Sequence, residues 1–369
     1  DKLLEQSGIV GEEENRKLLF LLASSYKMPY LLHGLVQGNS GEGKTHLINS
    51  IASCMPQEDI LNMTRITSKS LYHYRGKELI NKLILIQDYD GLDDEAQLAF
   101  REMQSAKVLS SSTVIKDSFG NIRSKIKEVN AHFASLMATT KAEIYYDNMS
   151  RSVIVGVDES EEQTLRIIGQ QNRKIAGLSN KENEEQAKQL LRNCMRVLKS
   201  YEVINPFADK LVLPSNAKML RRLNSQFQNF VSQITLLHQY QRKTDDKNRL
   251  ITTKEDIQLA VDIFFSAIVL KVDELDGSTR LFFEKMKAFV KEQPSGTTHR
   301  FTAREIRQAL NTSKTSAFKH MELLQQLEYI SPVEGNAARG FKYKVSYWDS
   351  LERLKATIKE DLSKQLLQL

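Results

Sequence analysis

The chain has few cysteines and no long apolar run, whereas many cysteines or long apolar runs are the features typical of secreted, zinc-binding and membrane proteins. Its two cysteines, Cys54 and Cys194, have no Cys or His neighbour at the spacing of metal ligands. So few cysteines are typical of a reducing cytoplasm, and we expect both thiols to be core residues. No uninterrupted apolar run approaches the ~20 residues that span a bilayer. We therefore expect a cytoplasmic protein with no membrane partner.

The overall composition is typical of a globular, basic protein. Apolar residues make up 41% and charged residues 27% of 369 residues, enough for two or three domains with separate cores. A net charge of +6 permits nucleic acid as a partner without demonstrating it. Residue 1 is Asp rather than Met, so we expect the chain to be a piece of a longer protein.

The strongest chemical signal is the octet G-x-x-x-x-G-K-T, formed by Gly38, Asn39, Ser40, Gly41, Glu42, Gly43, Lys44 and Thr45. Its glycines allow a tight turn whose N–H groups face a polyphosphate. Lys44 can reach the β- and γ-phosphates, and Thr45 can place its hydroxyl on Mg²⁺. Residues 30–36 are typical of a strand entering the loop and residues 46–52 of a helix leaving it. The octet predicts a site for ATP and Mg²⁺.

ATP hydrolysis also needs a carboxylate at the tip of a neighbouring strand and a group that polarises water. Residues 82–86 form an apolar run that ends in Gln87 and Asp88. The usual pair is Asp-Glu, and Gln87 departs from it because an amide cannot act as a base. Asp88 can hold the Mg²⁺ shell or act as a shorter base. Either the pair is unusual in this family, or Gln87 replaces a native carboxylate, since an isosteric Glu→Gln change would trap bound ATP.

Strand and helix patterns alternate from residue 29 to about residue 157, as in a parallel α/β sheet. The expected strands are residues 30–36, 60–64, 82–86, 131–138 and 152–157. From residue 159 to about 268 the pattern is almost entirely helical. We expect residues 179–186 and 243–250 to be mobile loops because they are polar and charged.

The order of these motifs resembles the AAA+ family of ring ATPases over residues 8 to about 240. In that family a third strand ends in a polar residue called sensor 1, a place that Thr140 or Thr139 would fill. The resemblance implies an α/β P-loop AAA+ core with a helical lid. It also implies assembly into a ring, expected to be a hexamer, with ATP between subunits.

Three arginines match catalytic positions of the same family. Arg151 resembles the arginine finger that enters the neighbouring subunit's site and stabilises transition-state charge there. Arg221 or Arg222 resembles sensor 2, a lid residue that reaches the γ-phosphate. The alternative for each is a solvated or ion-paired surface side chain.

Residues 113–127 predict a β-hairpin with Gly120 at its turn, and the basic residues of its outgoing limb share one face. Several AAA+ branches place a hairpin just before sensor 1, and in the minichromosome-maintenance (MCM) helicases it points at DNA. The resemblance implies sequence-tolerant DNA contacts from Lys116, Phe119, Arg123, Lys125 and Lys127. The alternatives are an exposed edge hairpin, which favours lysine anyway, or a hairpin of a protein unfoldase.

The C-terminal third resembles a winged-helix domain. A helix over residues 278–291 precedes a second helix opened by Thr302 and Glu305 at capping-box spacing. A recognition helix is expected over residues 317–328, followed by a strand pair. The resemblance implies phosphate contacts from Lys314, Lys319, His320 and Arg339. Winged helices that mediate protein contacts are the alternative.

These patterns give expected boundaries: a lead-in over residues 1–29, the AAA+ core over 30–158, the lid over 159–275, the winged helix over 276–348 and a C-terminal helix over 349–369. The resemblance implies a replicative helicase or translocase on single-stranded or forked DNA. Its type is that of bacterial or mobile-element motors paired with a primase or another replication module. Two alternatives stay open: an AAA+ initiator, loader or transposition regulator, and a protein-remodelling or signalling ATPase.

Overall fold

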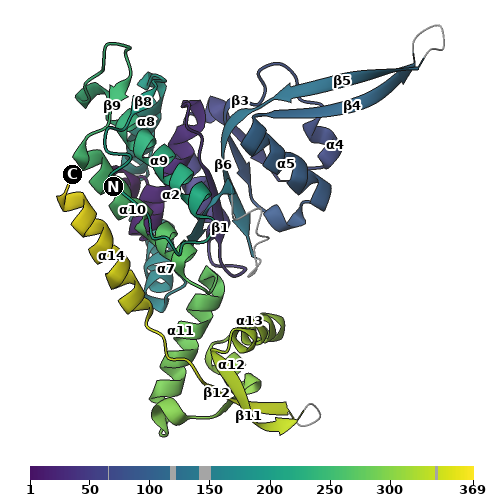
Figure 1. Ribbon diagram of the computed structural model, residues 1–369, viewed down its shortest axis with the longest axis vertical. Helices are drawn as coiled ribbons and strands as arrows, with labels where there is room; N and C mark the ends of the chain where they lie inside the picture. The colour runs from purple at the N-terminus through teal and green to yellow at the C-terminus, as the bar shows by residue number, and fades with distance from the viewer. Residues whose placement is uncertain (65, 117–121, 141–150, 337–339) are drawn as a thin grey trace. The chain divides into compact units, whose positions relative to one another are not determined.

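The computed structural model describes residues 1–64, 66–116, 122–140, 151–336 and 340–369. The chain divides into two compact units, one of residues 1–271 with 361–369 and the other of residues 272–360. Figure 1 shows their elements, and each unit is described by itself.

A five-stranded parallel sheet in the order β2-β3-β6-β1-β7 forms the centre of the first unit. Its strands are β1 (His33–Gln37), β2 (Ile60–Met63), β3 (Ile80–Ile86), β6 (His132–Thr139) and β7 (Val153–Gly156). All five residues of β1 and seven of the eight in β6 are buried, as expected of strands covered on both faces. The parallel sheet confirms the predicted α/β core.

Helices cover both faces of this sheet. On one face, Phe100 of α5 (Asp94–Ala106) packs on Phe133 of β6, with ring centroids 5.3 Å apart. On the other, Leu19 and Leu22 of α2 (Glu13–Ser24) lie over Gly34, where a Cβ would come within 3.1 Å of Leu22. Shorter elements complete this part of the chain: α1 (Lys2–Gln6), η1 (Ser25–Lys27), α3 (Lys44–Ser53), η2 (Gln57–Asp59), α4 (Ser68–Leu71) and η3 (Tyr89–Gly91).

Four long helices follow β7: α7 (Glu161–Ile175), α8 (Lys181–Val197), α9 (Leu220–Leu237) and α10 (Lys254–Val272). The predicted loop over residues 179–186 is wrong, because Asn180 caps α8 by accepting the N–H of Asn183 at 3.0 Å. The buried side chains of α8, Ala187, Leu191 and Met195, follow this polar segment at four-residue spacing, so the helix as a whole is amphipathic. The sequence also gave no sign of the short parallel pair β8 (Val203–Ile204) and β9 (Leu250–Ile251), or of η4 (Gln239–Gln241).

The two cysteines differ in environment. Cys54 is buried, as expected of a core residue, and its Sγ lies 3.5 Å from the Ser7 hydroxyl. Cys194 of α8 is exposed, so the prediction of a core position is wrong for this residue. It is exposed because α8 buries only the side of its amphipathic helix that carries Ala187, Leu191 and Met195.

An antiparallel hairpin of β4 (Val108–Lys116) and β5 (Ile122–Asn130) is inserted between α5 and β6. Its base is anchored by the paired residues Leu109 and Val129, which are both buried in the core of the first unit. Farther out, Val114 is 70% and Ile126 67% exposed, so the hairpin extends away from the sheet (Figure 1). The pairing confirms the predicted hairpin.

The second unit has its own core of helices packed on a small antiparallel sheet in the order β10-β12-β11. Its elements are α11 (Gly277–Glu292), η5 (Gly296–Thr298), β10 (Phe301–Thr302), α12 (Ala303–Ala309), α13 (Lys314–Gln326), β11 (Ile330–Asn336) and β12 (Gly340–Val345), and α14 (Leu351–Leu367) follows. The predicted capping box of Thr302 and Glu305 is present. Helix α13 begins three residues earlier than predicted, because Ser313 caps it by accepting the N–H of Ser316.

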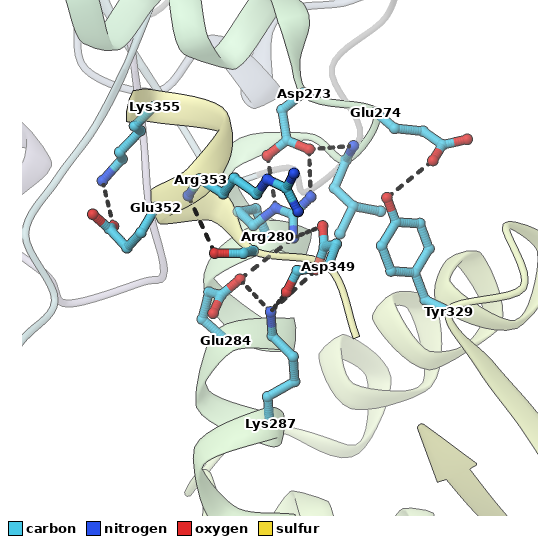
Figure 2. A network of polar contacts seen from close by, with 12 residues as sticks. Asp273, Glu274, Arg280, Glu284, Lys287, Tyr329, Asp349, Glu352, Arg353 and Lys355 are labelled. Atoms are coloured by element: carbon cyan, nitrogen blue, oxygen red, sulfur yellow. Dashed lines mark hydrogen bonds and ion pairs between the residues drawn. The ribbon is translucent and has the colours of Figure 1, made fainter. Parts of the chain in front are cut away.

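A buried charge network ties the start of the second unit to the segment before α14. Arg280 of α11 donates to both oxygens of Asp273 at 2.6 Å and forms an ion pair with Asp349 at 2.6 Å. Two turns along α11, Lys287 pairs with Glu284 and with the same Asp349 (Figure 2). Side chains this buried need such partners, because an unpaired buried charge is strongly destabilising.

Candidate functional site

The G-x-x-x-x-G-K-T octet forms the turn between β1 and α3, as predicted. Gly43 is the N-cap of α3 with φ +82°, and Gly41 has φ +91°, conformations that side chains rarely adopt. A Cβ on Gly38 would lie 2.4 Å from Val157, so this position also excludes a side chain. The loop therefore places its backbone at the N-terminus of α3, where N–H groups are available to an anion.

Lys44 folds back over this loop. Its Nζ donates to the carbonyl oxygens of Gly38 at 2.8 Å and Asn39 at 2.5 Å. Burial lowers the pKa of the Lys44 amine, and the carboxylates of Glu159, Asp90 and Glu42 oppose that shift. The amine is thus already partly removed from water and bonded to carbonyl oxygens of the loop. Exchanging these oxygens for those of a phosphate would therefore cost little further desolvation.

The acidic strand end lies at the same edge of the sheet, with β6 between β3 and β1. Asp88 is exposed, and its Oδ1 accepts the N–H of Gly91 at 3.2 Å. Over the part of the chain that the structure describes, its Oδ2 has no hydrogen-bond partner and is available to the hydrated shell of a metal ion. The amide Nε2 of Gln87 donates to Asn62 Oδ1 at 3.4 Å. Both residues follow the carboxyl end of β3, which β6 separates from β1 and the octet.

Asp90 is a residue that sequence reasoning missed. Its carboxylate accepts the hydroxyl of Thr139 at 2.6 Å, and the N–H and hydroxyl of Thr140 at 2.7 and 2.9 Å. It thus joins the end of β6 to the turn after β3. Its position two residues after Asp88 is the only sequence signal that could have drawn attention to it.

Glu159 is the second missed residue. It follows β7 by three residues, and its two oxygens accept the backbone N–H and the side-chain Nδ2 of Asn39, both at 2.7 Å. The next residue, Ser160, caps α7 by accepting the N–H of Gln163. Glu159 therefore connects the phosphate-binding loop directly to the start of α7. No residue spacing predicts this contact, which depends on the adjacency of β1 and β7.

The predicted arginines occupy different surroundings. Arg151 donates from Nε to the Ser105 hydroxyl at 2.6 Å and lies 3.8 Å from Glu102, so it contacts α5 of its own chain. Arg221 and Arg222 are exposed on the first turn of α9. The segment before Arg151, residues 141–150, lies outside the described residues.

Of the predicted DNA-contacting residues, Lys125 and Lys127 pair across the hairpin with Thr113 and Ser111. Lys125 is exposed, and the Nζ of Lys127 lies 3.3 Å from Nδ1 of His73. Lys116 and Arg123 belong to β4 and β5, whereas Phe119 lies outside the described residues.

In the second unit, Lys314 and Lys319 are exposed on α13, and Arg339 lies outside the described residues. The predicted phosphate contact from His320 is wrong. Its ring is buried, stacks on Phe282 with centroids 4.9 Å apart, and hydrogen-bonds Thr279 at 3.0 Å. This imidazole belongs to the core because α13 turns it towards α11.

A glycine-rich turn between a buried strand and a helix, with Lys-Thr at the helix start and acids on a nearby strand end, defines the class of P-loop nucleotide-binding NTPases. The comparison with protein families agrees. Residues 2–201 match the model of the MTBMA_p00010 P-loop domain, and the chain belongs to this family. No curated protein matches the chain. Within the described ranges, no helix has the length and apolar character needed to cross a membrane.

Proposed function

We propose that this chain is an AAA+ ATPase motor that moves along single-stranded or forked DNA as a ring, expected to be a hexamer. The observation that carries the proposal is the β4–β5 hairpin, inserted in a P-loop sheet between the acidic strand and β6. It extends from the sheet and exposes Lys125. In this proposal α7 to α10 form the lid, and residues 276–348 form a winged helix that contacts DNA through Lys314, Lys319 and Arg339.

The chemistry follows from the residues at the sheet edge. Lys44 would bind the β- and γ-phosphates, while Thr45 and Asp88 would hold the Mg²⁺ shell. The bound ion would neutralise developing charge on the transferred phosphoryl group. Thr140, fixed by Asp90, would face the γ-phosphate as sensor 1. Arg221 or Arg222 would approach from the lid, and Arg151 would leave its own Ser105 to serve the neighbouring subunit.

Position 87 decides how fast such a motor turns over. A glutamate there would accept a proton from the attacking water, whereas the amide of Gln87 cannot. The chain with Gln87 should therefore bind ATP well and hydrolyse it slowly. Gln87→Glu is nearly isosteric and should raise the hydrolysis rate without altering the fold.

The hairpin gives the test of the DNA half of the proposal. Lys125→Ala/Lys127→Ala removes two cations from β5, while Lys77→Ala/Lys181→Ala removes two exposed lysines elsewhere in the unit. In a Gln87→Glu background, the hairpin variant should lose DNA-stimulated hydrolysis and strand separation and keep DNA-free hydrolysis. Its single-stranded DNA binding should also depend less steeply on salt, since fewer counterions are released. The DNA proposal fails if both double variants behave alike.

Gln87 itself favours a second candidate, an initiator or loader that uses ATP as an assembly switch. A neutral amide that contacts Asn62 at 3.4 Å suits a protein that holds ATP rather than consumes it. Such a protein would form ATP-dependent assemblies on DNA, and Gln87→Glu would not accelerate its hydrolysis. Absent or salt-insensitive DNA binding would favour protein remodelling or signalling instead.

A further inference from the structure

The second unit contains a hollow of about 600 Å³ between α12 and α13, and of the residues that line it the proposed function uses Lys314 alone. Apolar side chains from three elements line it: Ala303 of α12, Ala317, Phe318 and Met321 of α13, and Tyr343 of β12. Together with Arg304, Arg307, Lys314 and Glu322 they define what we call the α12–α13 groove.

Phe318 is the unusual member of this lining. It is 66% exposed, whereas its neighbours Ala317 and Met321 on the same helix are 3% and 5% exposed. Covering an exposed phenylalanine side chain removes apolar surface from water, which favours binding. An aromatic ring that stands beside a hollow of this size offers an anchor point for another apolar side chain.

The rim of the groove is positively charged. Arg304, Arg307 and Lys314 line it, and across the described ranges no ion pair involving any of the three is found. Glu322 is the one carboxylate in the lining. Three cations beside one anion leave a net positive rim over an apolar floor, and the complement of that surface is an acidic segment with a bulky apolar residue.

We propose that the α12–α13 groove docks an acidic, amphipathic segment of a partner protein. Such a segment would bind as a helix laid into the groove, with one large apolar side chain against Phe318 and its carboxylates towards Arg304, Arg307 and Lys314. Nucleic acid fits less well, because Glu322 and the exposed ring would face phosphates. The proposal does not rest on the motor activity proposed above.

The test begins with a random 16-residue peptide library displayed on phage and selected against the whole chain, with counter-selection against Phe318→Asp. We expect the enriched peptides to share acidic residues and one aromatic or large aliphatic residue. A fluorescein-labelled consensus peptide should then bind with an affinity that falls as salt rises, since its ion pairs are partly exposed.

Three variants make the result specific. Phe318→Ala and Arg304→Glu/Arg307→Glu should each weaken the consensus peptide at least tenfold. Lys319→Ala, an exposed position on α13 outside the groove lining, should leave peptide binding unchanged. Trp348 fluorescence would verify that each variant is folded. The proposal is overturned if no peptide is enriched, if the enriched peptides lack acidic residues, or if Phe318→Ala binds them equally. It is also overturned if the chain binds a 20-base-pair DNA duplex and Phe318→Ala weakens that binding as much as Lys319→Ala does.

Discussion

The charge network of the second unit gives the sharpest stability prediction. The side chain of Asp273 is 1% and that of Arg280 6% exposed, and two hydrogen bonds of 2.6 Å join them (Figure 2). Removing one partner of a buried ion pair leaves the other charge uncompensated and costs about 3–5 kcal/mol. Arg280 would still have Asp349, so we expect Asp273→Ala to destabilise residues 272–360 by about 3 kcal/mol, near the lower limit.

The assay is urea unfolding followed by the fluorescence of Trp348, the chain's single tryptophan, which packs against the core of this unit. A unit of this size has a urea slope of about 1 kcal/mol/M, so the midpoint should fall by about 3 M. Glu352→Ala is the matched control, because the Lys355–Glu352 pair lies in the same unit with side chains 43% and 83% exposed. Equal midpoints for Asp273→Ala and Glu352→Ala would refute the reasoning.

A compensating variant separates the charge from the packing. Replacing both partners by apolar residues of similar volume is often neutral or stabilising. Asp273→Leu/Arg280→Met should therefore recover much of the stability that Asp273→Ala loses. If the double variant is no more stable than Asp273→Ala, the loss comes from packing geometry rather than from the missing charge partner of Arg280.

Three further predictions concern the first unit. Burial lowers the pKa of His33 to about 3 from 6.5, so below pH 6.5 the unfolded chain binds a proton that the folded chain excludes. The free energy of unfolding should therefore fall by about 2 kcal/mol from pH 7 to pH 5, measured by urea titrations followed by circular dichroism. His33→Gln should lose this part of the pH dependence. If Arg151 acts in trans, mixing Arg151→Ala with Lys44→Ala, each in a Gln87→Glu background, should restore part of the ATPase activity that each variant lacks alone. No recovery, together with a lower melting temperature for Arg151→Ala, would mean that Arg151 serves to bind Ser105 and Glu102 of its own chain. Glu159→Ala should weaken ATP binding about tenfold by calorimetry, because the loop loses two bonds to a charged acceptor, and an effect no larger than that of Glu161→Ala would contradict this role.

The core of the first unit could be predicted well because its strands are local apolar runs. The predicted strand over residues 82–86 lies inside β3, and the glycines of the octet mark the turn before α3 without ambiguity. Glycine at Gly41 and Gly43 is required by backbone conformation, which a sequence pattern can signal.

What could not be predicted depends on which distant segments meet. Asp90 and Glu159 acquire their roles from the adjacency of β3 with β6 and of β1 with β7, and no local pattern carries that information. The start of α8, residues 181–186, was predicted as a loop because these residues are polar and charged and the buried residues of the helix come later along it. His320 was misassigned for the converse reason, since its burial against Phe282 comes from the packing of α11 on α13.

The most direct test of the central claim is ATP hydrolysis by Gln87→Glu with and without single-stranded DNA, with Gln87→Glu/Lys44→Ala as the blank. The account predicts that Gln87→Glu hydrolyses ATP faster than the chain with Gln87, that DNA accelerates it further, and that the blank is inactive. If DNA has no effect and Gln87→Glu remains as slow as the parent chain, the motor is contradicted and a nucleotide-binding switch or scaffold is the better account.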